Sequence, residues 1–291
     1  MRRKIAYRVV FLGLTILIIP LVPIAIIFAG VSSPEYVIKG TLNIDLSQMA
    51  TLNYWEVYTS FLSHIIRFDL GTSVASGKPV IGIVLSGINE SLKIMFASIL
   101  FSYIVGTFVG ICIERSKRAN RVWNSSQFVF YVPIIVFSYL LLYFLSFIGA
   151  DFLSPIKYAA AMLALSVYPI YIVANTLKKT LQELRDSDFF MFHKALGFDS
   201  GQIWRKFCHK FIAIDYLSFL ENMLIFMMGF LFFVETPFGI PGMGYTFIVA
   251  IQRFDYPVII GFCIFAIIFL SIVGLIVDGV KMRLDPRLVG L

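Results

Sequence analysis

Long apolar runs separated by short polar segments dominate the chain. Six runs are long enough to cross a membrane as helices, and they are Val9–Ala29, Leu92–Ile113, Phe128–Phe147, Tyr158–Leu177, Ile212–Val234 and Val258–Val277. A helix rises about 1.5 Å per residue, so roughly 20 residues cross about 30 Å of hydrocarbon. The pattern therefore predicts an all-α integral membrane protein with six spanning helices in one transmembrane domain, residues 1–291.

Two details of the runs refine this prediction. The first run is longer than the roughly 7–15 apolar residues of a secretory signal, so we expect an uncleaved first helix. Pro133 lies inside the third run and Pro169 inside the fourth. Spanning helices tolerate such prolines because neighbouring helices can bond the freed carbonyl groups.

Composition supports a membrane protein. Hydrophobic residues make up 59% of the chain and charged residues 14%, whereas soluble domains carry about 25% charged residues. The net charge of +7 would suggest a nucleic-acid partner in a soluble protein. Here the charges lie between the apolar runs, so no nucleic-acid partner is expected.

The basic residues predict the orientation of the helices. The segments before the first run, after the second, after the fourth and after the last hold 18 of the 24 lysines and arginines. The side that is richer in basic residues is cytoplasmic, so both termini are expected inside. This orientation makes the connections 30–91 and 235–257 external and the connection 178–211 cytoplasmic.

The sequence offers no site for catalysis or for a metal ion. Three cysteines and three histidines are scattered without the spacing of metal ligands. The segment Gly71–Pro79, "GTSVASGKP", resembles a phosphate-binding loop. That motif needs four residues between its glycines and a Ser or Thr after the lysine, but here five residues intervene and Pro79 follows Lys78. We interpret it as a turn before a helix, and expect neither an enzyme nor a cofactor bound by this chain.

The connection 178–211 has the pattern of two short helices. The first is predicted over Leu181–Leu196 and ends at Gly197, a residue suited to a left-handed helix end. The second begins at Asp199, where Gln202 completes a capping box. The first helix carries several aromatic residues, which fit either a helix in the lipid interface or a knob that binds a soluble partner.

Glu221 is the clear case of a charged residue near the middle of a predicted span. Glu221 lies about nine residues into the fifth run, and Asn222 follows it. A carboxylate that faces lipid is costly, so Glu221 is expected to face the helix bundle, a partner subunit or water. It is either a structural hydrogen-bonding group or, with Asn222, a candidate pore-lining residue.

Three stretches of the chain resemble a known family. They are "FDLGTSVASGKPVIGIVLSGINESLKI", "DFFMFHKALGFDSGQIWRKFCHKF", and "ETPFGIPGMGYTFIVAIQRFDYPV" with the later "VDGVKMRLDPR". Together they resemble the permease subunit of a type I ABC importer of the dipeptide, oligopeptide and nickel family. The resemblance extends from about Phe68 to the end of the chain.

This resemblance implies a six-helix permease that forms half of a pore in the bacterial cytoplasmic membrane. The expected partners are a second, homologous permease subunit, two ABC ATPase subunits that hold ATP and magnesium, and an extracytoplasmic substrate-binding protein. The expected substrates are peptides or a related small solute such as a complex of nickel with a chelator.

The resemblance also indicates two groups of site residues. The group expected to contact the ATPase is Asp188, Phe189, Phe190, Phe192, His193, Lys194, Ala195, Leu196 and Gly197. The group expected to form an external gate or to contact the binding protein is Glu235, Phe238, Pro241, Gly242, Gly244, Arg253 and Asp255. For any single residue of the second group, a plain connecting role is an equal alternative.

A self-contained secondary transporter or channel is the alternative function. Such a protein usually carries several buried ionisable residues for ion coupling, and here Glu221 is the clear case. Purification in native form distinguishes the two functions, because only an importer subunit brings an ATPase with it.

Overall fold

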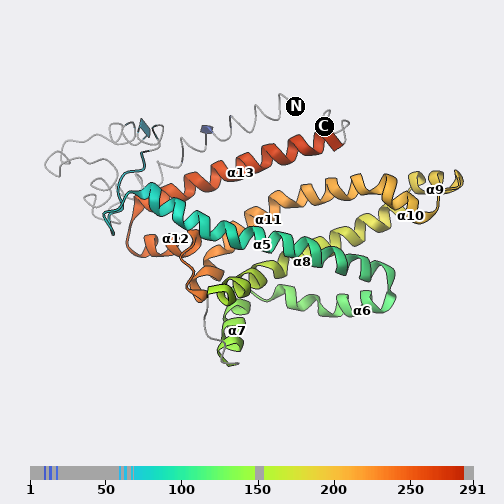
Figure 1. The fold of residues 1–291 in the computed structure, drawn as a ribbon, viewed down its shortest axis with the longest axis horizontal. Coiled ribbons are helices and arrows are strands. Elements are labelled where there is room, and N and C mark those ends of the chain that lie inside the picture. Colours follow the sequence, from blue (N-terminus) through green and yellow to red (C-terminus); the bar gives the residue numbers. More distant parts are fainter. Residues whose placement is uncertain are drawn as a thin grey trace. The chain divides into compact units, whose positions relative to one another are not determined.

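The computed structural model describes residues 69–147 and 154–284, together with positions 10, 13, 14, 18, 59, 62, 63 and 67. Most of the first predicted span, most of the connection 30–91 and residues 285–291 lie outside the described residues. The helices are α5 (Val80–Arg115), α6 (Lys117–Ser126), η2 (Gln127–Tyr131), α7 (Ile134–Phe147), α8 (Ser154–Arg185), α9 (Asp188–Ala195), α10 (Ser200–Ile203), η3 (Trp204–Cys208), α11 (His209–Phe238), α12 (Met243–Gln252) and α13 (Tyr256–Leu284) (Figure 1). The chain forms two compact units: residues up to Leu92 with Gly239–Leu275, and Lys93–Phe238 with Ile276–Leu291.

Among the described residues, four helical segments are long and apolar enough to cross a membrane. They are Val80–Arg115, Pro155–Arg185, Ser200–Phe238 and Tyr256–Leu284, and each contains one of the predicted runs. The helices are longer than the predicted runs. Helix α5, for example, has 36 residues, whereas the apolar pattern predicted a span over Leu92–Ile113. At about 1.5 Å per residue such a helix exceeds the hydrocarbon thickness, and the part before Leu92 begins with the apolar residues Val80–Leu85 and then carries Ser86, Asn89, Glu90 and Ser91.

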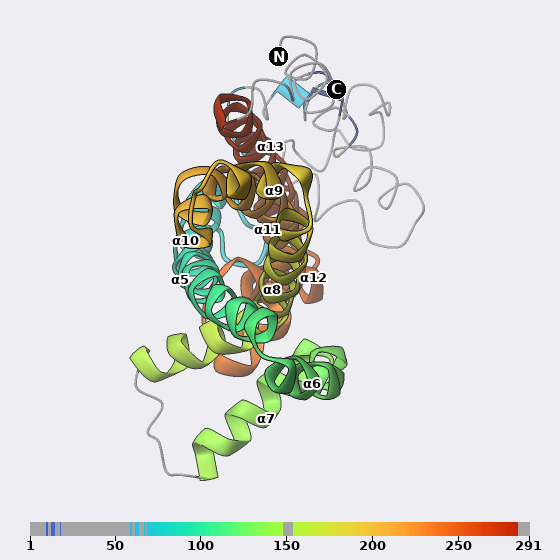
Figure 2. The same ribbon diagram turned by 90° about the vertical axis from the view of Figure 1, so that its right-hand side faces the viewer.

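The third predicted span is not one helix, and the prediction of a continuous helix over Phe128–Phe147 is wrong. A 3₁₀ turn ends at Tyr131, α7 begins at Ile134, and the two halves meet at 95° (Figure 2). Val132, at φ −65° and ψ 126°, has the extended conformation that a residue before proline prefers. Pro133 therefore breaks this span, whereas Pro169 lies inside a continuous α8.

In the second unit, α5 and α8 run parallel in close contact. Ser98 Oγ donates to Met162 O at 3.1 Å, and Ser102 Oγ is 3.4 Å from Ser166 O, with 64 residues between the partners in both cases. The same offset continues to Gly110, where an added Cβ would lie 3.0 Å from Ala174 O. Small residues recur every fourth position along α5, namely Ser98, Ser102, Gly106 and Gly110, and such a face lets two helix backbones approach closely.

Helices α8 and α11 run antiparallel, side by side (Figures 1 and 2). The rings of Tyr168 and Phe226 lie 4.3 Å apart, and Thr180, later in α8, donates its hydroxyl to Asp215, earlier in α11. By length and apolar composition, the bent pair Lys117–Tyr131 and Ile134–Phe147 makes a fifth candidate span when its two halves are counted as one.

The first unit contains the segment that resembled a phosphate-binding loop. Thr72 and Pro79 form an isolated antiparallel bridge, and Ser73 N donates to Lys78 O at 2.8 Å. Gly71 and Gly77 have φ of 72° and 68°, a left-handed conformation that glycine adopts readily. The segment is a compact turn directly before α5, which confirms the interpretation as a turn before a helix.

Candidate functional site

The short helix α9 is separated from α8 by a side-chain cap. Ser187 Oγ accepts a hydrogen bond from Phe190 N at 3.3 Å and donates one to Leu184 O at 2.6 Å. Serine favours such N-caps over helix interiors because its hydroxyl competes for backbone groups. The prediction of a single helix over Leu181–Leu196 is therefore wrong: α8 continues to Arg185 and α9 starts afresh at Asp188.

The aromatic residues of α9 divide between two faces. Phe190 is 5% exposed and packs in a small apolar cluster with Ile203 and Cys208. Met191, Phe192 and Leu196 are largely exposed, as are Asp188, Lys194 and Ala195. Phe190 thus packs α9 against the rest of the protein. Met191, Phe192 and Leu196 form the exposed apolar surface of α9.

Helix α9 ends in a Schellman motif at Gly197. Gly197 N donates to Lys194 O at 3.0 Å, and Phe198 N donates to His193 O at 3.3 Å. Gly197 has φ +91°, so the predicted left-handed helix end is confirmed. The next turn begins with the predicted capping box of Asp199 and Gln202, which is also confirmed.

His193 and Phe189 belong to an aromatic group at the base of α9. His193 Nδ1 lies 2.8 Å from Phe189 O, and its ring lies 4.2 Å from that of Phe207. Phe189 contacts the rings of Phe207 and Phe211 edge to face. In the part of the chain that the structure describes, no group of His, Cys, Asp and Glu side chains could hold a metal ion.

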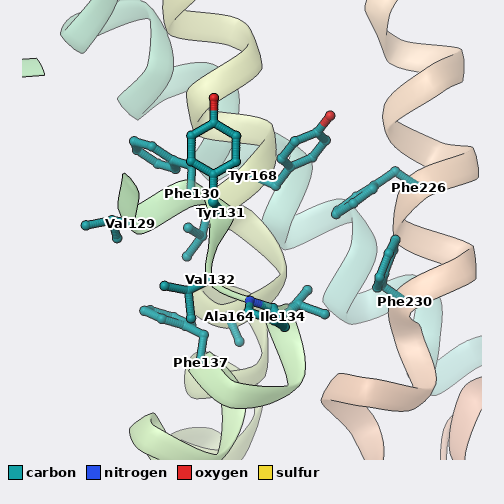
Figure 3. A pocket seen from close by; sticks show the side chains of 12 residues that line it. Val129, Phe130, Tyr131, Val132, Ile134, Phe137, Ala164, Tyr168, Phe226 and Phe230 are labelled. Atoms are coloured by element: carbon teal, nitrogen blue, oxygen red, sulfur yellow. The ribbon is translucent and has the colours of Figure 1, made fainter. Parts of the chain in front are cut away.

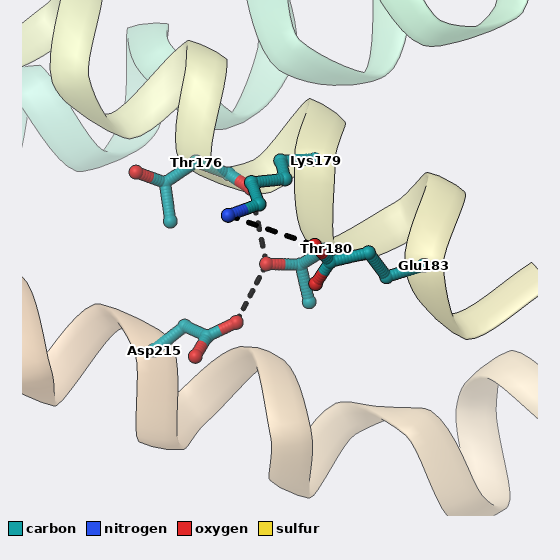
Figure 4. Close-up of polar contacts among 5 residues, drawn as sticks. All are labelled: Thr176, Lys179, Thr180, Glu183 and Asp215. Carbon is teal, nitrogen blue, oxygen red and sulfur yellow. Dashed lines mark hydrogen bonds and ion pairs between the residues drawn. The ribbon is translucent and has the colours of Figure 1, made fainter. Parts of the chain in front are cut away.

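An ion pair and a hydrogen bond join the end of α8 to α5 and to α11. Arg185 Nη1 lies 2.6 Å from Oε1 of Glu114, whose side chain is 4% exposed at the end of α5. Thr180 donates its hydroxyl to Oδ2 of Asp215 on α11 at 2.6 Å (Figure 4). The nearby pair Lys179–Glu183 is exposed on both sides and follows one helix face, so it contributes little to stability.

Little in the local sequence indicated these contacts. Glu114 is one acid among four basic residues after the second run, and its partner Arg185 belongs to another helix. The only available hint was a charged residue at the very end of an apolar helix.

An apolar pocket lies in the second unit beside the bend at Pro133. Its volume is about 480 Å³. It is lined from the bend by Val129, Phe130, Tyr131, Val132, Pro133, Ile134 and Phe137, and from α8 and α11 by Ala164, Val167, Tyr168, Phe226 and Phe230 (Figure 3). The broken span thus leaves an aromatic-lined space next to α8 and α11.

The two candidate pore-lining residues differ in their relation to this pocket. Asn222 is exposed and lies four residues before Phe226, which is itself four residues before Phe230. Residues spaced by four share one face of a helix, so Asn222 continues the α11 face that lines the pocket. Glu221 is half-buried and does not line the pocket.

The predicted external connection 235–257 contains a helix that the sequence reading did not predict. Helix α11 continues to Phe238, Gly239 follows with φ +60°, and the apolar stretch Met243–Gln252 forms α12. Met243 N donates to Ser91 Oγ at 2.6 Å, so a residue of α5 caps α12. Several residues of the predicted contact group are buried, namely Glu235, Phe238, Gly242, Gly244 and Asp255, whereas Pro241 and Arg253 are exposed.

Asp255 holds the turn before α5 in place. It is 3% exposed. Ser73 Oγ donates to its Oδ2 at 2.5 Å, and Val74 N donates to its Oδ1 at 3.2 Å. Ala75 N adds a longer contact of 3.4 Å to Oδ2. The carboxylate is therefore occupied inside the protein, and the exposed residues around it form the surface.

Helix α12 ends in a second Schellman motif, with Phe254 in the position that glycine usually takes. Phe254 N donates to Ile251 O at 3.2 Å, and Asp255 N donates to Ala250 O at 2.8 Å. Phe254 has φ +53° and is the one non-glycine residue with positive φ in the described part of the chain. This conformation costs a residue with a Cβ about 1–2 kcal/mol, and sequence reasoning cannot foresee it because nothing marks a phenylalanine as left-handed.

Comparison with known proteins identifies the family of the chain. It is 26% identical over 240 residues to the dipeptide transport system permease protein DppB of Bacillus subtilis (strain 168), covering 79% of this chain and 78% of that protein. It is 25% identical over 254 residues to the nickel import system permease protein NikB of Staphylococcus aureus (strain bovine RF122 / ET3-1), covering 84% and 74%. A structure of the MetNI methionine ABC transporter in inward-facing conformation has a similar fold, with a TM-score of 0.57 and 17% identity over 70% of this chain and 97% of that chain. The model of the family "Binding-protein-dependent transport system inner membrane component" matches residues 102–290, well over half of the sequence, and the chain belongs to that family.

Proposed function

We propose that this protein is a transmembrane subunit of an ATP-driven importer and forms half of its pore. The observation that carries the proposal is the construction of α9. It is a short helix with its own cap at each end, a buried Phe190 below and exposed Met191, Phe192 and Leu196 above. A rigid helix with exposed large apolar side chains is suited to the groove of a soluble partner. In a subunit of this family that partner is an ABC ATPase.

The complete importer contains further chains. We propose a second, homologous permease subunit across the pore, two ATPase subunits that hold ATP and magnesium, and an extracytoplasmic binding protein. The basic residues support six spanning helices with both termini in the cytoplasm of a bacterial cell. In this scheme the chain itself holds no nucleotide and has no enzymatic activity.

The polar contacts at the end of α8 suggest how a displacement of α9 is transmitted to the spanning helices. When ATP draws the ATPases together, α9 moves with the subunit bound to it. Arg185 is joined to Glu114 of α5, and Thr180 is joined to Asp215 of α11. A displacement of the end of α8 therefore acts on α5 and α11 as well. Such coupling allows the helix bundle to switch between two arrangements.

The names of two relatives support two candidate classes of substrate for this importer. Their names refer to dipeptide transport and to nickel import. We propose that this importer carries peptides or a small metal complex, with Asn222 and the adjoining pocket near the path and Glu221 as an acid that meets cationic groups. Glu221→Gln then weakens transport of a cationic peptide and leaves that of a neutral peptide within twofold.

Native purification tests the function itself. The tagged chain, extracted in mild detergent, should bring an ABC ATPase, and Phe192→Ala together with Leu196→Ala should lose it while the second permease subunit remains. Phe144→Ala, which truncates an exposed residue of α7, is the matched control and should retain the ATPase. Purification of the wild-type chain without any ATPase, from cells that express the whole importer, contradicts the proposal.

A further inference from the structure

The left-handed Phe254 is held in place from both sides. The two Schellman hydrogen bonds fix its backbone to the last turn of α12. The next residue, Asp255, is fixed by Ser73 and Val74. Phe254 therefore cannot relax to a right-handed conformation without breaking one of these sets of contacts.

The side chain of Phe254 gains little within the chain from this arrangement. It is 55% exposed. Strained residues persist where the surrounding structure enforces them, and they gather at functional sites. An exposed aromatic ring in an enforced, unfavourable conformation indicates a use outside this chain.

The neighbourhood of Phe254 is apolar at its centre and basic around it. Ile251 on the same helix end is 44% exposed, and Arg253 is exposed as well. Lys78 belongs to the exposed turn that Asp255 anchors. Among the described residues, neither Arg253 nor Lys78 has a carboxylate within ion-pair distance. The acid of this turn, Asp69, accepts from Gly71 N at 3.0 Å.

We propose that Phe254, with Arg253 and Lys78, anchors the extracytoplasmic binding protein of the importer. The partner surface that fits is an apolar pocket bordered by carboxylates, because aromatic residues dominate interface energies and rim charges of opposite sign steer association. The inference rests on the proposed function. The alternative occupant is lipid, but the exposed turn Ala75–Lys78 beside Phe254 carries the polar side chains of Ser76 and Lys78 and no large apolar side chain, which does not favour lipid.

The test uses the complete importer in lipid nanodiscs and its binding protein loaded with a dipeptide. ATP hydrolysis is followed as the concentration of binding protein is raised. Phe254→Gly keeps the backbone conformation and removes the ring, so it should raise the half-saturating concentration at least tenfold and affect the maximal rate much less. Phe254→Tyr should restore the wild-type value, whereas a merely structural role would not depend on the ring. Phe144→Ala, at 57% exposure, is the control and should change neither quantity.

The charged residues give a second, independent readout. Lys78→Ala and Arg253→Ala should each raise the half-saturating concentration severalfold at low salt, and the difference from wild type should shrink as salt screens the charges. The inference is overturned if Phe254→Gly leaves the half-saturating concentration within twofold of wild type. It is also overturned if the variant differs from wild type only in nanodiscs of one lipid charge, which indicates a lipid contact. If binding protein does not stimulate even the wild-type importer, the proposed function fails instead.

Discussion

The ends of α9 and α12 have the same hydrogen-bonding pattern but are occupied by different residues. At α9 the left-handed position is Gly197, with φ +91°, and at α12 it is Phe254, with φ +53°. Glycine reaches this conformation without steric cost, whereas phenylalanine does not. Both residues adopt the left-handed conformation, but only phenylalanine does so at a steric cost. A phenylalanine at position 254 therefore indicates that its side chain has a function.

The two ends are also supported by different forces. Below α9, Phe190, Ile203 and Cys208 form an apolar cluster. Next to α12, the buried carboxylate of Asp255 gathers donors from a turn about 180 residues earlier in the chain. Apolar packing tolerates small shifts, whereas a buried carboxylate depends on each donor. The α12 end should therefore be the more sensitive to a single polar substitution.

Asp255→Ala should have the largest effect. It leaves the donors Ser73 Oγ and Val74 N without their acceptor, which costs about 3 kcal/mol at this site. The Val74 amide should then lose about 100-fold of its protection from hydrogen exchange in the purified complex. Amides of α9 such as Leu196 serve as the internal control and should exchange as in wild type. Unchanged exchange at Val74 means that Asp255 does not hold the turn.

Gly197→Val should have the next largest effect, and at the other helix end. A β-branched residue in the left-handed position costs about 2 kcal/mol, so α9 should tilt relative to the turn that follows it. We expect loss of ATP-driven transport with membrane insertion retained. Gly197→Asn should lose less, because asparagine tolerates this conformation. Transport by Gly197→Val at the wild-type rate contradicts the role of α9 as the ATPase contact.

The comparison of glycine with alanine at positions 197 and 254 should give the smallest effects, with glycine the more stable residue at both. Gly197→Ala should destabilise the complex by about 1 kcal/mol, whereas Phe254→Gly should be about 1 kcal/mol more stable than Phe254→Ala, because only glycine relieves the strain. Thermal unfolding of the purified complex measures both. If Phe254→Ala is as stable as Phe254→Gly, the backbone at Phe254 is not strained.

Local signals in the sequence predicted one of these ends and not the other. Gly197 and the pair Asp199–Gln202 are short-range signals, and both predictions are confirmed. The contacts that define the α12 end join residues far apart in the chain, such as Ser73 with Asp255 and Ser91 with Met243. No local pattern encodes such pairings, so the sequence predicted the segment as a connection and missed α12.

Two of the prolines inside predicted spans, Pro133 and Pro169, show a similar limit. Both Pro133 and Pro169 interrupt apolar runs, but only Pro133 breaks its helix. Half of the apolar part of α8 is buried, more than in the other long helices, where the share is 28%. In α7 only Ser138 is buried. Packing against neighbours keeps α8 continuous, and this packing becomes visible only in the folded chain.

We propose that α9 faces the ATPases in the cytoplasm while the end of α12 faces the binding protein outside. Paired cysteine labelling tests it most directly, in a variant without the native Cys112, Cys208 and Cys263. An impermeant maleimide should modify Ala75→Cys, in the turn that Asp255 anchors, in intact cells, and should modify Lys194→Cys, on α9, only in inside-out vesicles. Modification of both positions from the same side of the membrane contradicts the account.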